Sequence, residues 1–190
     1  MNNKSYLNFD TIEQVPCRSP KKVIDVLYPY FKDKVVCELG CRFGDILLGF
    51  SYYAKECLGY EIDSNCINIA KTRPYKCPSH ISQENCMIDD TLEKMKKYKP
   101  ECFFSYSHAT WYQRWFETIH NKFPNAIIVT SADPREGING SKVTNNERKY
   151  LEILQNKYPG NYIEFEYEEE GQRAKTFLLH VFIPKEIKNN

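Results

Sequence analysis

The sequence predicts an α/β fold with a mostly parallel sheet, and three observations lead to this class. Strand-like apolar runs alternate along the chain with helix-like stretches. A glycine turn joins the first strand to the helix that follows it, within residues 34–63. The last two strand-like stretches, Tyr162–Tyr167 and Lys175–Ile183, follow one another with no helix between them. Such an order favours a three-layer sandwich, in which helices cover both faces of one sheet.

The elements of the first half are justified by local signals. Ser19 and Pro20 are a typical N-cap and first helical residue. Apolar residues at helical spacing then continue to about Phe31. The strands and helices expected next are a strand at Val35–Cys37, a helix opened by Asp45, a strand through Leu58 and Tyr60, and a helix at Ser64–Arg73.

The second half continues the alternation. Pro74, Pro78 and Pro100 mark loops between its first elements. The elements expected are strands at Ser79–Met87, Cys102–Tyr106 and Ala126–Thr130, and helices at Asp89–Tyr98, Thr110–Phe123 and Asn145–Tyr158.

Composition limits the class of protein. The chain has 190 residues, 42% of them hydrophobic, and a net charge of +1. This length predicts one domain over residues 1–190, with residues 1–18 as an irregular extension. The near-neutral charge provides no global field that would attract nucleic acid or an acidic membrane.

The cysteines and the N-terminus indicate a compartment. None of the eight cysteines forms a C-x-x-C pair, and several fall inside expected strands or helices. This usage argues against zinc or any other metal site and against a disulfide framework, so reduced thiols are expected. The first ten residues lack an apolar signal segment, and no stretch is apolar enough to cross a membrane. We therefore expect a cytoplasmic protein.

The turn and the next strand carry the functional signal. Gly40 and Gly44 let the backbone approach a ligand, and the helix after them directs free N–H groups at an anion. Glu61 follows the second strand, where a carboxylate can accept hydrogen bonds from two ribose hydroxyls. Asp63 is expected to cap the next helix rather than to bind a ligand. The segment therefore predicts half of a nucleotide-binding unit.

These residues resemble a known family. E-L-G-C-R-F-G (residues 38–44) and G-Y-E-I-D (residues 59–63) are similar to the first two motifs of class I S-adenosylmethionine (SAM)-dependent methyltransferases. Their pattern is [DE]-x-G-x-G-x-G, followed by an acid that ends strand 2. Arg42 departs from it at the middle glycine. The dinucleotide fingerprint G-x-G-x-x-G fits less well. The resemblance implies a Rossmann-like, seven-stranded sheet with its last strand antiparallel, and SAM as cofactor.

The resemblance also implies which residues hold the cofactor. Glu61 would accept the ribose, and Glu38 would hold backbone N–H groups or reach the SAM ammonium through water. Asn85 and Cys86 stand where the family reads adenine with an Asp. The cofactor-binding residues predicted in this way are Glu38, Gly40, Cys41, Arg42, Gly44, Glu61, Ile62, Asn85 and Cys86.

The family's catalytic segment follows strand 4 and reads F-S-Y-S-H-A-T-W-Y here (residues 104–112). It lacks the N-P-P-Y signature of amino-group methylation of adenine or glutamine. The catalytic residues expected from this position are Tyr106, Ser107 and His108. His108 could help to deprotonate the acceptor, although a structural or helix-capping histidine is an equally simple interpretation.

Two features bear on the methyl acceptor. Residues 15–27 resemble the V-P-x-x-[TS]-P-x-x-V-[VI] lead-in of small protein-lysine methyltransferases, although an ordinary Ser-Pro helix start explains the same residues. The lysine run at residues 94–99 is either a solvated helix face or an RNA-binding surface. A macromolecular acceptor is expected, with protein lysine favoured over RNA.

A hypothesis of a different class competes with the enzyme. Arg42 replaces a glycine, Asn85 replaces an acid, and the segment after strand 4 lacks a known catalytic signature. Together these departures would suit a catalytically degenerate domain that binds SAM or a protein partner.

Overall fold

The computed structural model describes residues 20–106, 109–132, 152–168 and 176–185. The irregular extension expected at residues 1–18, which includes the start of the motif at residues 15–27, lies outside these ranges. Within them, residues 152–157 form a short helix. The labelled elements are α1 (Pro20–Phe31), β1 (Val35–Leu39), α2 (Asp45–Phe50), β2 (Glu56–Glu61), α3 (Ser64–Ala70), β3 (Ser79–Gln83), α4 (Asp89–Met95), η1 (Lys96–Tyr98), β4 (Cys102–Ser105), α5 (Ala109–Lys122), β5 (Ile127–Ala132), β6 (Gly160–Glu168) and β7 (Thr176–Pro184).

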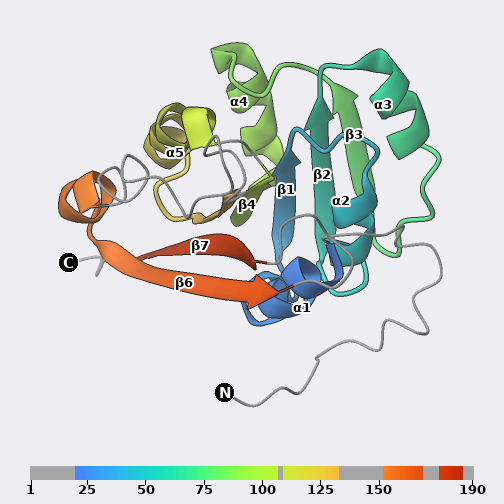
Figure 1. The fold of residues 1–190 in the computed structure, drawn as a ribbon. Helices are drawn as coiled ribbons and strands as arrows, with labels where there is room; N and C mark the ends of the chain where they lie inside the picture. The colour runs from blue at the N-terminus through green and yellow to red at the C-terminus, as the bar shows by residue number, and fades with distance from the viewer. Residues whose placement is uncertain (1–19, 107–108, 133–151, 169–175, 186–190) are drawn as a thin grey trace.

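One seven-stranded sheet organises these elements, in the order β3-β2-β1-β4-β5-β7-β6 (Figure 1). The pairs from β3 to β5 are all parallel. The last strand, β7, inserts between β5 and β6 and runs antiparallel to both. The expected α/β class, the Rossmann-like layout and the antiparallel last strand are therefore confirmed.

Helices α1 and α2 cover one face of the sheet. Val23, Ile24, Leu27 and Phe31 recur at helical spacing in α1, and all are fully buried. They pack with Leu47 and Phe50 of α2 and with apolar residues of β1, β4 and β5. A side chain on Gly49 would overlap Ile24, so this glycine lets the two helices approach closely.

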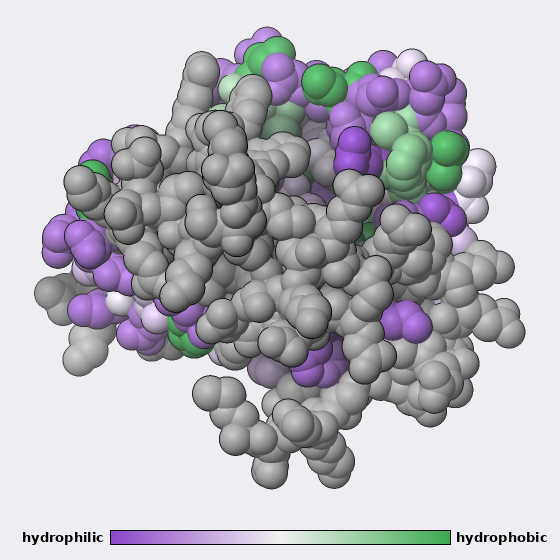
Figure 2. All heavy atoms as spheres, viewed as in Figure 1, coloured by the Kyte–Doolittle hydropathy of each residue, from purple (hydrophilic) through white to green (hydrophobic). Residues whose placement is uncertain are grey.

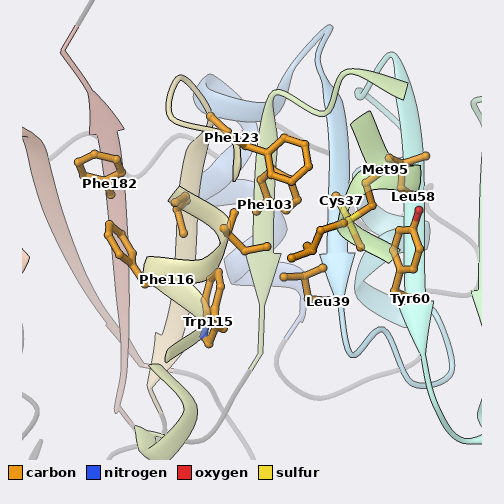
Figure 3. Packing of buried hydrophobic residues seen from close by; sticks show 14 of the residues in the cluster. Cys37, Leu39, Leu58, Tyr60, Met95, Phe103, Trp115, Phe116, Phe123 and Phe182 are labelled. Carbon is orange, nitrogen blue, oxygen red and sulfur yellow. The ribbon is translucent and has the colours of Figure 1, made fainter. Parts of the chain in front are cut away.

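Helices α4 and α5 cover the opposite face. Trp115 and Phe116 of α5 belong there to one buried cluster with Phe103 of β4 and Phe182 of β7 (Figure 3). Leu92 and Met95 of α4 belong to the same cluster. Phe116 and Phe182 meet edge to face, with ring centroids 5.2 Å apart. Burying both sheet faces explains why the strands are apolar runs rather than alternating sequences.

Several elements end earlier than expected, and for two of them a local cause is visible. The third strand ends at Gln83 instead of Met87, because Asn85 turns the chain: its side-chain oxygen accepts the Met87 N–H and its backbone oxygen accepts the Ile88 N–H. The third helix ends at Ala70 instead of Arg73. Arg73 precedes Pro74, and a residue before proline disfavours the helical conformation.

Among the described residues, no helix is long and apolar enough to cross a membrane. The cysteines in this part of the chain all have free thiols. Within the same ranges no three His, Cys, Asp or Glu side chains are grouped to hold a metal ion.

Candidate functional site

The candidate site lies where the strand order reverses. The chain order runs outward from β1 through β2 and β3 on one side, and from β4 to β5 on the other. Glu38 of β1 is in register with Gly59 of β2 and with Phe104 of β4. Glu38, Glu61 and Tyr106 therefore end up at the same edge of the sheet. Ligands of open α/β sheets bind at this reversal point, beyond the carboxyl ends of the strands.

In the turn between β1 and α2, every second residue from Gly40 to Gly44 has a left-handed backbone conformation. Gly40, Arg42 and Gly44 have φ angles of 72°, 46° and 74°. A side chain on Gly44 would overlap the Tyr75 hydroxyl, so glycine is required there on two grounds. Arg42 is exposed and adopts the backbone conformation that a glycine favours. The departure from the motif at Arg42 thus preserves the shape of the turn, at a cost in backbone strain.

Glu61 ties this turn to the second strand. One carboxylate oxygen, Oε2, accepts the Arg42 N–H at 3.0 Å. The other, Oε1, accepts the N–H groups of Ile62 and Asp63 at 2.7 and 3.1 Å. A carboxylate oxygen has two lone pairs, so Oε2 retains room for one further donor. Glu61 therefore both shapes the turn and presents an acceptor at its surface.

Glu38 lies beneath the turn and is 2% exposed. Burial raises its pKa well above the usual range of a carboxyl group, the Leu47 backbone N–H lowers it, and the nearby Asp45 and Glu61 raise it further. The Glu38 Oε2 atom is buried and has no hydrogen-bond partner among the described residues. An unmatched buried acceptor is costly, and a bound donor such as an ammonium group would satisfy it.

Carboxyl groups lie around the turn where other nucleotide-binding folds hold a phosphate. Asp45 occupies the first turn of α2, and Glu38 accepts an N–H from the same helix end. In dinucleotide-binding proteins the pyrophosphate occupies this position. Here the carboxyl groups of Glu38, Asp45 and Glu61 surround that position, and the Asp45 carboxylate is paired with Arg73. The arrangement suits a ligand that brings hydroxyl groups and positive charge.

Two other predicted cofactor residues, Ile62 and Cys41, differ in their exposure to solvent. Ile62 is 66% exposed and directly follows Glu61. Figure 2 shows hydrophobic surface among hydrophilic residues at the upper right, where α3 lies. Cys41 is 3% exposed, and its thiol faces Gly59 in the core, so only its backbone contributes to the turn.

Asn85 and Cys86 follow β3, next to the Glu61 strand. Gln83 at the end of β3 donates to the Ile62 carbonyl at 3.3 Å, which joins the two strand ends. Burial raises the pKa of the Cys86 thiol to about 11, and the nearby Glu61 carboxylate contributes to this rise. Asn85 is exposed but already bonds Met87 N–H through its side-chain oxygen. The structure thus brings both residues to the same edge.

The predicted catalytic segment is only partly described. Tyr106 directly follows β4, is half-buried and packs against the α1–α2 side of the core. Ser107 and His108 lie outside the described residues.

Sequence reasoning missed two residues that contact the turn. The Arg73 Nε atom donates to the Phe43 carbonyl at 3.0 Å, and its Nη2 atom pairs with the Asp45 carboxylate. Tyr75 lies against Gly44, and its buried hydroxyl oxygen has no hydrogen-bond partner within the described part of the chain. Both belong to the loop between α3 and β3, which matches no motif. The only signal in the sequence is one arginine in a loop, which does not point to Asp45.

A polar row on the α4–α5 face was also missed. Ser105, Thr130 and His180 are in register on β4, β5 and β7, and all three are buried. Glu164 of β6 continues the row, with its Oε1 atom 3.6 Å from His180 Nδ1. One step away from the site edge, the same face carries the apolar row Phe103, Ile128, Phe182 and Tyr162. The change from apolar to polar residues therefore occurs at the level where β4 ends.

The left-handed conformation of Arg42 gives a testable difference between two variants. We expect Arg42→Gly to be more stable than Arg42→Ala by about 1 kcal/mol, because only alanine retains the steric cost of a positive φ. Both variants lose the same side chain, so each is the control of the other. Denaturant unfolding measures the difference, and equal stabilities would show that position 42 does not hold a left-handed backbone in solution.

Comparisons with known proteins rest on structure. No protein-family model and no curated protein sequence matches the chain. A candidate SAM-dependent methyltransferase from Streptococcus mutans superposes with a TM-score of 0.63 at 10% identity, covering 89% of this chain and 50% of that one. An rRNA methylase from Streptococcus thermophilus gives 0.57 at 11% identity, covering 90% and 99%. A candidate methyltransferase complexed with S-adenosylhomocysteine (SAH) gives 0.63 at 8% identity, covering 89% and 50%.

The chain thus spans half the length of two of these structures and nearly the whole of the rRNA methylase. At identities this low, the superpositions establish the architecture alone. The chain has the seven-stranded, Rossmann-like fold of the class I SAM-dependent methyltransferases.

Proposed function

We propose that this protein is a SAM-dependent methyltransferase that acts on a macromolecule. The observation that carries the proposal is the acceptor set at the strand-order reversal: Glu61 with a free lone pair beside the glycine turn, and Glu38 with an unmatched buried oxygen. SAM brings a ribose diol, an ammonium and a sulfonium. These are the hydroxyl groups and positive charges that the surrounding carboxylates favour.

Each residue of the candidate site would contact a different part of SAM. Glu61 accepts a ribose hydroxyl, Glu38 faces the ammonium end, and the exposed Ile62 offers an apolar surface to the base. Asn85 retains amide donors for the base, since its oxygen is used within its own turn. Bound SAM would supply an electrophilic methyl group. The chain's task is then to align the acceptor's lone pair with that methyl group and to exclude water.

The catalytic segment that we propose is the one after β4, with Tyr106, Ser107 and His108. Its support is positional, because Tyr106 leaves the sheet two residues beyond the level of Glu38. An acceptor amine or hydroxyl loses a proton during transfer, and His108 is the residue of this segment suited to receive it.

For the acceptor we propose RNA. The rRNA methylase of S. thermophilus shares this fold over nearly its whole length, and none of the three neighbours above is described as a lysine methyltransferase. The lysine preference drawn from residues 15–27 gains no support from these neighbours. The lysine run contributes little to the RNA proposal, because Lys94 and Lys96 are paired with Glu84 and Glu93.

The competing hypothesis of a catalytically degenerate domain loses its first argument. The Arg42 side chain is exposed, and its backbone keeps the shape that a glycine would give. Asn85 stays at the adenine-side edge. SAM binding alone fits both hypotheses, so methyl transfer is the property that separates them.

Replacing Glu61 tests the cofactor assignment. Glu61→Ala should weaken SAH binding by about 1.5–3 kcal/mol, because hydrogen bonds to a charged acceptor are lost. The matched control is Glu56→Ala at the opposite end of β2, where the carboxylate pairs with His80 at 3.0 Å. Isothermal titration calorimetry measures both, with thermal melts to confirm folding. Equal affinities in the two variants would reject the role of Glu61.

The raised pKa of Glu38 predicts that SAM binding depends on pH. The carboxyl group is neutral below its raised pKa and attracts a cation only above it, so SAM affinity should increase as pH rises through that pKa. SAH keeps the ammonium group that Glu38 is proposed to face, so its affinity should increase over the same pH range. Glu38→Gln should remove most of the slope and leave the part due to Asp45, whose pKa burial also raises. An unchanged slope in Glu38→Gln would contradict this account.

Labelled methyl transfer tests the reaction and the acceptor together. Incubation with labelled SAM and separated RNA, protein and small-molecule fractions should place label in RNA, sensitive to ribonuclease and absent with Glu61→Ala. Label in protein lysine would instead restore the lysine preference. Label confined to small molecules would overturn the macromolecular acceptor, and no transfer to any fraction would favour the degenerate domain.

A further inference from the structure

The glycine turn is held from a side that no motif residue occupies. We propose that Arg73 is a positioning residue for the cofactor: by gripping the turn at two points, it fixes the backbone against which SAM binds. This inference rests on the proposed function, but its structural half can be tested without any ligand.

The two contacts of Arg73 reach different parts of the turn. Its Nε atom donates to the carbonyl of Phe43 at 3.0 Å, between the left-handed Arg42 and Gly44. Its Nη2 atom pairs with the carboxylate of Asp45, the first residue of α2. The Arg73 side chain is 21% exposed, so water competes weakly for these contacts. Arg73 thus joins the last part of the turn to the start of the helix.

Helix α2 needs such support. It has six residues, and its N-cap, Gly44, makes no side-chain capping bond. A helix this short is not stable on its own, so its position depends on tertiary contacts. The loop that carries Arg73 also touches the other end of α2, where the Lys76 N–H donates to the Ser51 hydroxyl at 3.0 Å. The loop between α3 and β3 therefore contacts α2 at both of its ends.

Arg73 and Glu61 hold the turn from opposite sides. Glu61 of β2 accepts the Arg42 N–H, whereas Arg73 donates to the carbonyl of the next residue. Left-handed residues persist only where the surroundings hold them. With the Arg73 contacts removed, the Phe43 carbonyl would lose this donor, and the Asp45 carboxylate would lose its cation beside Glu38.

The geometry requires arginine rather than any cation. The guanidinium presents donors in fixed, diverging directions, so that one side chain reaches both Phe43 and Asp45. A lysine ammonium is a point charge that can neutralise Asp45 but cannot hold both partners in the same way. The difference separates positioning from simple charge compensation.

The binding experiment compares three variants by calorimetry with SAH. Arg73→Ala should weaken binding about tenfold to a hundredfold, the loss expected for hydrogen bonds with a charged donor. Arg73→Lys should recover only part of this loss. Lys71→Ala, which removes a positive charge from an exposed position two residues away, should bind as the wild type does. Wild-type affinity in Arg73→Ala, or full recovery in Arg73→Lys, would overturn the proposal.

Hydrogen–deuterium exchange on the ligand-free protein supplies the second readout. In Arg73→Ala the amides of the turn and α2 should exchange faster, while those of β4 and β5 stay protected. Faster exchange throughout the sheet would show general destabilisation and overturn a positioning role, as would unchanged exchange in the turn. If the wild type fails to bind SAH, the proposed function fails, and the exchange result still decides whether Arg73 holds the turn.

Discussion

The shape of the site depends on one carboxylate accepting three backbone N–H groups. Glu61 bonds Arg42 in the turn after β1, and Ile62 and Asp63 in the connection after β2. The two strand ends are thereby locked together at the point where the strand order reverses. The exposed position of Ile62 and the alignment of Asp63, which caps α3 through the N–H groups of Asn65 and Cys66, follow from this connection.

The same interactions decide what kind of ligand the site can accept. In most nucleotide-binding turns the backbone N–H groups are free to bind a phosphate. In this turn the N–H groups of Gly40 and Cys41 donate to the Tyr60 carbonyl, that of Arg42 to Glu61, and that of Gly44 to the Cys41 carbonyl. These four donors are satisfied within the protein, and Glu61 keeps an acceptor at the surface. The site therefore suits a ligand that brings donors.

The sequence carried enough information for the sheet and for one side of the site. Apolar runs and glycine spacing are local signals, and the carboxyl ends of parallel strands converge, so Glu38, Gly44 and Glu61 could be placed together in advance. The pairing of Arg73 with Asp45 could not, because 28 residues separate them and neither follows a periodic pattern. The inward direction of the Cys41 side chain could not be predicted either, because side chains no longer alternate between the two faces beyond the end of a strand.

The contacts that complete the turn span 19, 28 and 30 residues of sequence. Local helices and neighbouring strands form before contacts of long sequence separation can compensate for the entropy of loop closure. The turn can therefore take its final shape only after β1, β2 and α3 have assembled around it. The hydrogen bonds by which Glu61 holds the turn are exposed to solvent. Exposed hydrogen bonds open locally at a lower free energy than buried strands do, so the site opens more readily than the sheet beneath it.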